Sequence, residues 1–169
     1  MCDIMDSLKS ARDNGFFFNS SDDMKKELLE FPKHDHSLFE IYYMKNGSCR
    51  YFIDNNSYLV ESGDIVLIPS GIIHNTQYSD CSYSRYLVNC SKYFIPNSVL
   101  KSISNFKYVY YNENIKLKVE EIFSEIKHDY EKRDAFSKES LQSLLYSLFI
   151  LLARNPNQKV NTIFMESAH

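Results

Sequence analysis

Glycine and proline are scarce in this sequence, which has four of each among 169 residues. Disordered chains combine few hydrophobic residues with many polar ones, but here hydrophobic residues make up 44 %. No hydrophobic run reaches the ~18 residues needed to cross a membrane. The longest one, from Leu144 to Ala153, is interrupted by Tyr146 and Ser147. We therefore expect one ordered domain, or a domain with an appendage, that does not enter a membrane.

Cysteine and clustered positive charge are also scarce. The four cysteines, at positions 2, 49, 81 and 90, form no Cys-x-x-Cys pair. With no signal peptide, this spacing indicates reduced thiols in a cytoplasmic protein. Nineteen Lys and Arg against 22 Asp and Glu give a net charge of -3. Because proteins hold nucleic acid by neutralising phosphates with clustered Lys and Arg, we expect no DNA binding by these residues alone.

Aromatic residues, in contrast, are abundant, with 13 Tyr and 12 Phe. They favour β-structure and a pocket with aromatic walls. Short alternating segments separated by turn residues predict a barrel or sandwich. The predicted strands are residues 15–18, 34–44, 49–54, 58–61, 65–68, 73–78, 83–89 and 108–111.

The last third of the chain has a different pattern. Hydrophobic residues at helical spacing predict a first helix over 115–130, and a second helix runs from Ser137 to Asn155. The second helix is apolar over more than the ~100° stripe of a surface helix. One side can pack on the first helix or the barrel, and the other requires a partner. We predict a homodimer interface, although an intramolecular core is the alternative; its residues are Leu141, Leu144, Leu145, Leu148, Phe149 and Leu152.

One stretch, from His34 to His74, carries the most chemistry. His34, His36 and Glu40 lie an even number of residues apart. Side chains on a strand alternate between faces, so these three share one face of an extended segment. With His74 arriving from another strand, they would form a metal site of three nitrogens and one oxygen.

This spacing resembles the two motifs of the cupin superfamily. The first motif matches at His34, His36, Glu40 and Gly47, and the second at Gly63, Pro69, Gly71 and His74. Tyr78 stands where that family has Asn, which leaves the four ligands intact. The resemblance implies a mainly β fold, a cupin barrel (a double-stranded β-helix, or jelly roll) followed here by two C-terminal α-helices.

A barrel followed by two helices adds a second resemblance. The segment FEIYYMKNGSCRYFIDNNSYLVESGDIVLIPSGIIHNTQYS is similar to the N-terminal sensor domain of AraC-type transcriptional regulators. That family implies an effector in the barrel, dimerisation by the helices and DNA binding by a further C-terminal domain. We therefore expect a barrel with an N-terminal arm over 1–111, a helical dimerisation hairpin over 112–155 and the start of a linker over 156–169. A sensor cut from a longer regulator and a stand-alone domain both fit.

The candidate site has two interpretations. In the first, His34, His36, Glu40 and His74 hold one divalent ion, either Zn, Ni, Fe or Mn. In the second, they form a pocket whose polar groups bond to one another or to an organic effector, since a buried Glu needs a partner such as His. We predict that the ligand-binding residues are His34, His36, Glu40, Tyr42, His74 and Phe18. Residues 16–18 would be either a lid over the effector or an edge strand on the barrel.

Two functions follow from these observations. The first is a ligand-sensing, dimerising module without catalytic residues, which binds a small polar effector such as a sugar. The second is a small metal-dependent cupin enzyme, an isomerase or dioxygenase. An enzyme needs an acid or base near the metal. The sequence shows no such further set, and a barrel enzyme does not need the two helices, so we favour the sensor.

Overall fold

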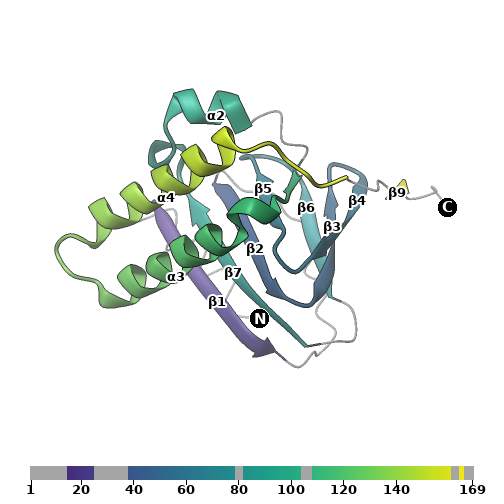
Figure 1. Ribbon diagram of the computed structural model, residues 1–169, viewed down its shortest axis with the longest axis horizontal. Coiled ribbons are helices and arrows are strands. Elements are labelled where there is room, and N and C mark those ends of the chain that lie inside the picture. Colours follow the sequence, from purple (N-terminus) through teal and green to yellow (C-terminus); the bar gives the residue numbers. More distant parts are fainter. Residues whose placement is uncertain (1–14, 25–37, 79–81, 104–107, 161–163, 166–169) are drawn as a thin grey trace.

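Two antiparallel sheets face each other in the computed structural model, which describes residues 15–24, 38–78, 82–103, 108–160 and 164–165 (Figure 1). One sheet has the strand order β1-β7-β2-β5-β8, and the other has the order β6-β3-β4-β9. The strands are β1 (Phe16–Met24), β2 (Phe39–Asn46), β3 (Ser48–Ile53), β4 (Asn56–Glu61), β5 (Ile65–Ile68), β6 (His74–Tyr78), β7 (Tyr83–Cys90), β8 (Val109–Tyr110) and β9 (Phe164–Met165).

Tight turns connect the short strands at the positions where the sequence predicts them. The β3–β4 hairpin turns on Asp54 and Asn55, which have φ values of 48° and 65°. These positive angles match the right-handed twist of the flanking strands. Gly63 precedes β5 with a φ of 94°, and a Cβ atom there would lie 2.9 Å from the ring of Tyr111. The motif glycine is therefore favoured by its backbone angle, whereas the Tyr111 side chain would have to shift to admit a larger residue.

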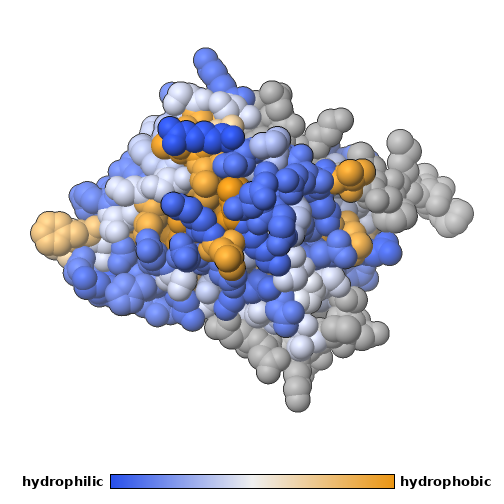
Figure 2. Space-filling view, in the orientation of Figure 1, coloured by the Kyte–Doolittle hydropathy of each residue, from blue (hydrophilic) through white to orange (hydrophobic). Residues whose placement is uncertain are grey.

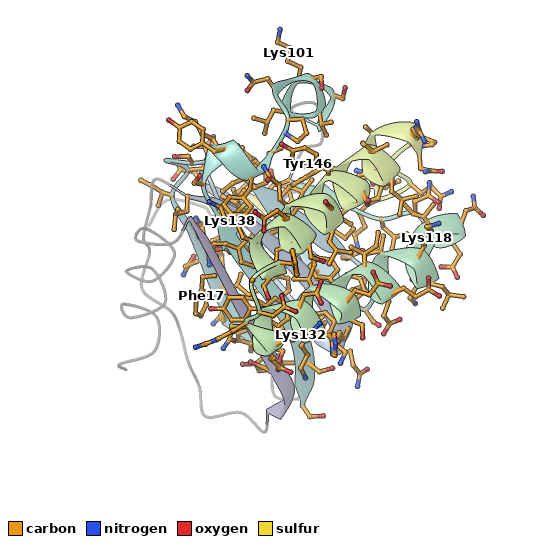
Figure 3. All side chains as sticks on the ribbon, turned by 90° about the vertical axis from the view of Figure 1, so that its left-hand side faces the viewer. Phe17, Lys101, Lys118, Lys132, Lys138 and Tyr146 are labelled. Atoms are coloured by element: carbon orange, nitrogen blue, oxygen red, sulfur yellow. The ribbon has the colours of Figure 1, made fainter. Side chains whose placement is uncertain are left out.

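Helices cover the outer face of the five-stranded sheet (Figures 1 and 3). They are α2 (Asn97–Ile103), α3 (Lys116–Lys132) and α4 (Ser137–Arg154), with short 3₁₀ turns at Lys92–Phe94 and Glu113–Ile115. Aromatic rings fill the contact between sheet and helices. Phe123 of α3 stacks on Tyr43 of β2 at 5.2 Å and on Tyr86 of β7 at 5.7 Å. Phe149 of α4 meets Phe39 of β2 at 5.9 Å. In the described part of the chain, no helix is long and apolar enough to cross a membrane.

A second core fills the space between the two sheets. Alternation along the strands of the five-stranded sheet sends one set of side chains towards the helices and the other set into the barrel. On β2, for example, Tyr43 packs beneath the helices, whereas Tyr42 and Met44 belong to the barrel interior. The candidate site lies among these interior side chains.

The segment that follows α4 returns to the barrel. Asn157 accepts a hydrogen bond from the backbone N–H of Tyr111 at 3.0 Å and donates one to the carbonyl of Val109 at 2.9 Å. Lys159 continues this attachment with ion pairs to Asp64 at 2.7 Å and Glu61 at 3.1 Å. Residues 155–159 are thus bonded to the barrel although the sequence predicts a linker from residue 156 onward.

The leucine residues of α4 require a correction to the predicted interface. Five of the six lie in the core of the single chain, because they face α3 and the outer face of the sheet: Leu141, Leu145, Leu148, Phe149 and Leu152. Only Leu144 is partly exposed. Two buried sides of α4, one against α3 and one against the sheet, account for the width of its apolar stripe. The five buried residues cannot also form a surface while the chain keeps this packing.

Candidate functional site

Three polar side chains converge inside the barrel from three different strands. Glu40 of β2 is 5 % exposed and His74 of β6 is 2 % exposed. The Oε2 atom of Glu40 lies 3.3 Å from Nε2 of His74. The hydroxyl of Tyr51, on β3, donates a hydrogen bond to Oε1 of Glu40 at 2.9 Å. A buried carboxylate is costly without partners; here Tyr51 donates to one of its oxygens, and His74 lies beside the other.

The backbone fixes the protonation pattern of His74. Its Nδ1 atom lies 2.8 Å from the carbonyl oxygen of Ile72, which can only accept, so Nδ1 carries the proton. In a neutral imidazole Nε2 is then an acceptor, and it faces a carboxylate oxygen that is also an acceptor. The 3.3 Å contact becomes favourable when a proton or a cation is shared between the two atoms. A metal-binding His is commonly oriented by this kind of backbone contact.

A second polar group lies nearer the other end of the same strands. Arg85 of β7 is partly buried and donates hydrogen bonds to the hydroxyl of Tyr78 at 3.2 Å and to Oδ1 of Asn19 at 3.0 Å. Its guanidinium carbon lies 5.9 Å from the ring centroid of Tyr42. The hydroxyls of Tyr42 and Tyr78 are 3.3 Å apart. Burial raises the pKa of both phenols, so they remain protonated and neutral at pH 7.

Asn89 of β7 adds an unsatisfied acceptor to the interior. It is paired in register with Glu40 and is 3 % exposed. Its side-chain oxygen has no hydrogen-bond partner among the described residues. Such atoms are rare in folded proteins and mark a place where a water molecule or ligand would bind.

Of the six predicted ligand-binding residues, three lie inside the barrel, two lie outside the described residues, and Phe18 lies beneath the helices. Glu40, His74 and Tyr42 lie inside the barrel, as predicted, and Glu40 contacts His74 directly. His34 and His36 lie outside the described residues. No group of three or more metal-binding side chains occurs within the described ranges.

Phe18 requires a correction. Strand β1 is an edge strand paired with β7, and Phe18 faces the helices, 5.7 Å from Tyr86 and 5.8 Å from Tyr130. The edge-strand interpretation of residues 16–18 is therefore confirmed, and the lid interpretation is wrong. The neighbouring interior position is occupied by Asn19, whose side chain binds Arg85.

Sequence reasoning did not identify Tyr51, Arg85 or Asn89 as site residues. The signal was present for all three, because each occupies an inward position of an alternating strand. On β7, for example, Tyr86, Val88 and Cys90 pack beneath the helices, which assigns Arg85 and Asn89 to the opposite face. What was lacking was the identity of the buried face, which requires the pairing of the strands.

Comparison with known proteins agrees with this geometry. Residues 26–149 match the sequence profile described as the AraC-like ligand binding domain. The search of curated proteins finds no match. The structure is similar to apo ToxT from Vibrio cholerae, with a TM-score of 0.57 and 20 % identity over 83 % of this chain and 56 % of that chain. This chain therefore spans a little over half of the length of ToxT, and at this identity the likeness concerns the fold.

Two weaker structural similarities were also found. Unsaturated-fatty-acid-bound ToxT from the same organism has a TM-score of 0.49 and 17 % identity, over 82 % of this chain and 52 % of that chain. An RmlC-like cupin protein with a double-stranded β-helix fold from Methanocaldococcus jannaschii has a TM-score of 0.40 and 14 % identity, over 45 % of this chain and 70 % of that chain.

Proposed function

Because the chain belongs to the family of AraC-like ligand-binding domains, we propose that it is the effector-sensing and dimerising domain of a bacterial AraC-type transcription regulator. In this proposal it acts in the cytoplasm and binds a small polar molecule, such as a sugar, inside the barrel. DNA would be contacted only by a further C-terminal domain of the regulator.

The observation that carries this proposal is the polar cluster between the two sheets. Glu40, His74 and Tyr51 hold hydrogen-bonding groups at fixed positions in an otherwise aromatic and aliphatic interior. Asn89 adds an acceptor without a partner among the described residues. Few, precisely oriented polar groups within an apolar surround are typical of a site that binds small molecules.

The state of Tyr51 favours a role in binding a ligand over a role in catalysis. Burial raises the pKa of Tyr51 well above its ordinary value, so its phenol donates a hydrogen bond at pH 7 and does not act as a base. Its hydroxyl is also engaged by Glu40. These residues are therefore suited to binding and orienting a molecule.

The Glu40–His74 pair would also suit a divalent metal ion. Nε2 of His74 and Oε2 of Glu40 are the two ligand types of the cupin motif, and they lie 3.3 Å apart with the imidazole already oriented by Ile72. We propose that these two residues, with His34 and His36, would hold one such ion, either Zn, Ni, Fe or Mn. The ion would act as a Lewis acid towards an oxygen of the effector.

Ligand-dependent thermal unfolding tests the sensor. We expect a compound from a panel of sugars and other small polar molecules to raise the unfolding midpoint, since a ligand at a hundred times its Kd stabilises a protein by about 2.7 kcal/mol. Glu40→Gln keeps the shape of the side chain and removes its charge, and should weaken that binding roughly tenfold or more. Glu121→Gln, on the exposed surface of α3, is the matched control. Equal binding by wild type and Glu40→Gln would show that the ligand does not contact the cluster of Glu40, His74 and Tyr51, and would contradict this assignment of the site.

A further inference from the structure

Arg85 brings a positive charge into the barrel that none of the described residues neutralises. Its two hydrogen bonds go to the amide oxygen of Asn19 and the hydroxyl of Tyr78. Both acceptors are neutral, and no carboxylate among the described side chains, which do not include those of Asp22 and Asp23, forms an ion pair with Arg85. A guanidinium has five N–H donors, so these two contacts use only part of its capacity.

Aromatic rings surround this charge. The ring of Tyr42 lies beside the guanidinium, and Tyr78 is stacked on Tyr83 with ring centroids 3.7 Å apart. Tyr42, Tyr78 and Tyr83 are each at most 5 % exposed. Ring faces attract the cation, but an interaction of this kind does not cancel a full charge. These buried rings lower the local dielectric constant beside the partly buried Arg85, which strengthens the attraction between Arg85 and any anion that enters.

Burying a charge without an opposite charge costs stability, and proteins usually avoid it. A side chain kept in this state at the interior of a binding domain is best explained by a charged ligand. We propose that the effector carries a carboxylate group, and that Arg85 binds this group at the end of the barrel bounded by Asn19 and Tyr78. This inference rests on the proposed function and specifies the ligand class of the same domain.

The number and shape of the groups favour a carboxylate over a phosphate. A planar carboxylate matches the two parallel N–H donors of one guanidinium. A phosphate with nearly two negative charges would require more cations, and Arg85 is the only charged group among the described contacts of this site. The phenols of Tyr42 and Tyr78 are neutral at pH 7, so they place no negative charge beside the bound anion. The rings then provide a surface for the apolar body of the effector.

Benzoate and benzamide provide a direct test, because they share an aromatic ring and differ in charge. Unfolding midpoints would be measured with each compound up to 50 mM, at ionic strength matched with sodium chloride. We expect benzoate to raise the midpoint with a Kd in roughly the millimolar range, and benzamide to have little effect. Arg85→Met should weaken benzoate binding roughly tenfold or more, through loss of the charge-assisted pair. Arg50→Met, an exposed arginine of β3, is the matched control and should bind benzoate as wild type does.

Two further variants keep the test decisive if Arg85→Met does not fold. Arg85→Lys keeps the charge but loses the planar guanidinium that can donate two parallel hydrogen bonds to a carboxylate. This variant should therefore bind benzoate more weakly than wild type. Asn19→Ala releases one donor of Arg85 and should bind benzoate at least as tightly.

Three results would overturn the inference. They are equal effects of benzoate and benzamide, no effect of benzoate at 50 mM, and stronger stabilisation by inorganic phosphate. Neutral ligands that depend on Glu40 but not on Arg85 would leave the proposed function standing and refute only this step.

Discussion

Lys159 joins the segment after α4 to the barrel through two carboxylates. Its Nζ atom lies 2.7 Å from Oδ2 of Asp64 and 3.1 Å from Oε2 of Glu61. The side chain of Asp64 is 2 % exposed and that of Lys159 is 16 % exposed, whereas Glu61 is 58 % exposed. The Glu61 contact is therefore screened by water and contributes little, and the Asp64 contact determines the effect of removing Lys159.

Lys159→Met keeps the length of the side chain and removes the cation. Breaking a fully buried ion pair costs about 3–5 kcal/mol, because the remaining charge stays buried without a partner. Since Lys159 retains some exposure, we expect a loss of about 2 kcal/mol, or a midpoint lowered by ~4–8 °C for a chain of this size. Adding Asp64→Asn should restore about 1 kcal/mol relative to the sum of the single effects. The Asn side chain can still accept the hydrogen bond that Asp64 accepts from the N–H of Glu61.

The pH dependence of stability provides a second test of the ion pair between Lys159 and Asp64. Burial alone would lower the pKa of Lys159, but its bonds to Asp64 and Glu61 outweigh this and raise the pKa above the ordinary 10.5. The folded protein thus holds this proton more tightly than the unfolded chain does. The stabilisation is complete below about pH 10.5 and is lost as the pH rises further. Burial also raises the pKa of Asp64 above 3.8, so protonation of Asp64 in acid favours the folded state and does not mimic the loss of Lys159.

Circular dichroism during thermal and urea unfolding would measure these effects. Lys132→Met is the control, because Lys132 pairs with Asp134 at the surface, with 56 % and 36 % exposure, and its removal should leave the midpoint unchanged. The curves of wild type and Lys159→Met should converge above about pH 10.5, where Lys159 loses its proton. A Lys159→Met protein as stable as wild type at pH 7, or a constant difference across this pH range, would refute the reasoning.

The remaining predictions concern the helices and the metal. If the proposed dimer uses the exposed hydrophobic residues of the helices, Leu117→Lys with Ile150→Lys should give a folded monomer by sedimentation, because these side chains are 76 % and 38 % exposed. Leu145→Lys should instead unfold the chain, since Leu145 is fully buried; a wild-type monomer at high concentration would exclude the dimer. For the metal, elemental analysis of protein purified without a metal column should find close to one equivalent of a divalent ion, and less than a tenth of an equivalent would exclude it.

Hydrophobic patches over α3 and α4 are compatible with such an interface (Figure 2). Orange surface alternates there with hydrophilic side chains. The view along the helix pair shows Lys118, Lys132 and Lys138 extending from the same two helices (Figure 3). A dimer surface on these helices would therefore combine separated apolar residues with lysines, in contrast to the continuous leucine stripe that the sequence suggests.

The fold could be predicted because its signals are local. Turn residues with positive φ, such as Asp54 and Asn55, locate the hairpin, and the motif spacing places Glu40 and His74 on strands that meet. Helical periodicity locates both long helices. The stripe on α4 was assigned to the wrong surface because periodicity shows that a face is buried and not what buries it. Leu145 has the same sequence signature whether it contacts α3 or a second chain.

The charges of the interior could not be assigned from the sequence because they depend on register. On the paired strands β2 and β7, Glu40 lies opposite Asn89, and Met44 lies opposite Arg85. A shift of one residue in the register between β7 and β2 would move Arg85 to the helix-covered face of the sheet. The sequence shows an alternating strand with one arginine, but only the pairing places that arginine inside the barrel with Glu40.

This register also explains why Glu40 does not serve as the counter-ion of Arg85. Arg85 and Asn89 are four residues apart on one strand, or about 13 Å at roughly 3.3 Å per residue, and Glu40 lies beside Asn89. Two unit charges at this backbone spacing attract by only about 1.3 kcal/mol at an effective dielectric constant of ~20, and no ion pair joins the described side chains of Arg85 and Glu40. Glu40 is satisfied locally by Tyr51 and His74, whereas Arg85 has only neutral partners among the described residues. The barrel is therefore electrically asymmetric along β7, and a carboxylate at Arg85 would supply the charge that Glu40 is too distant to provide.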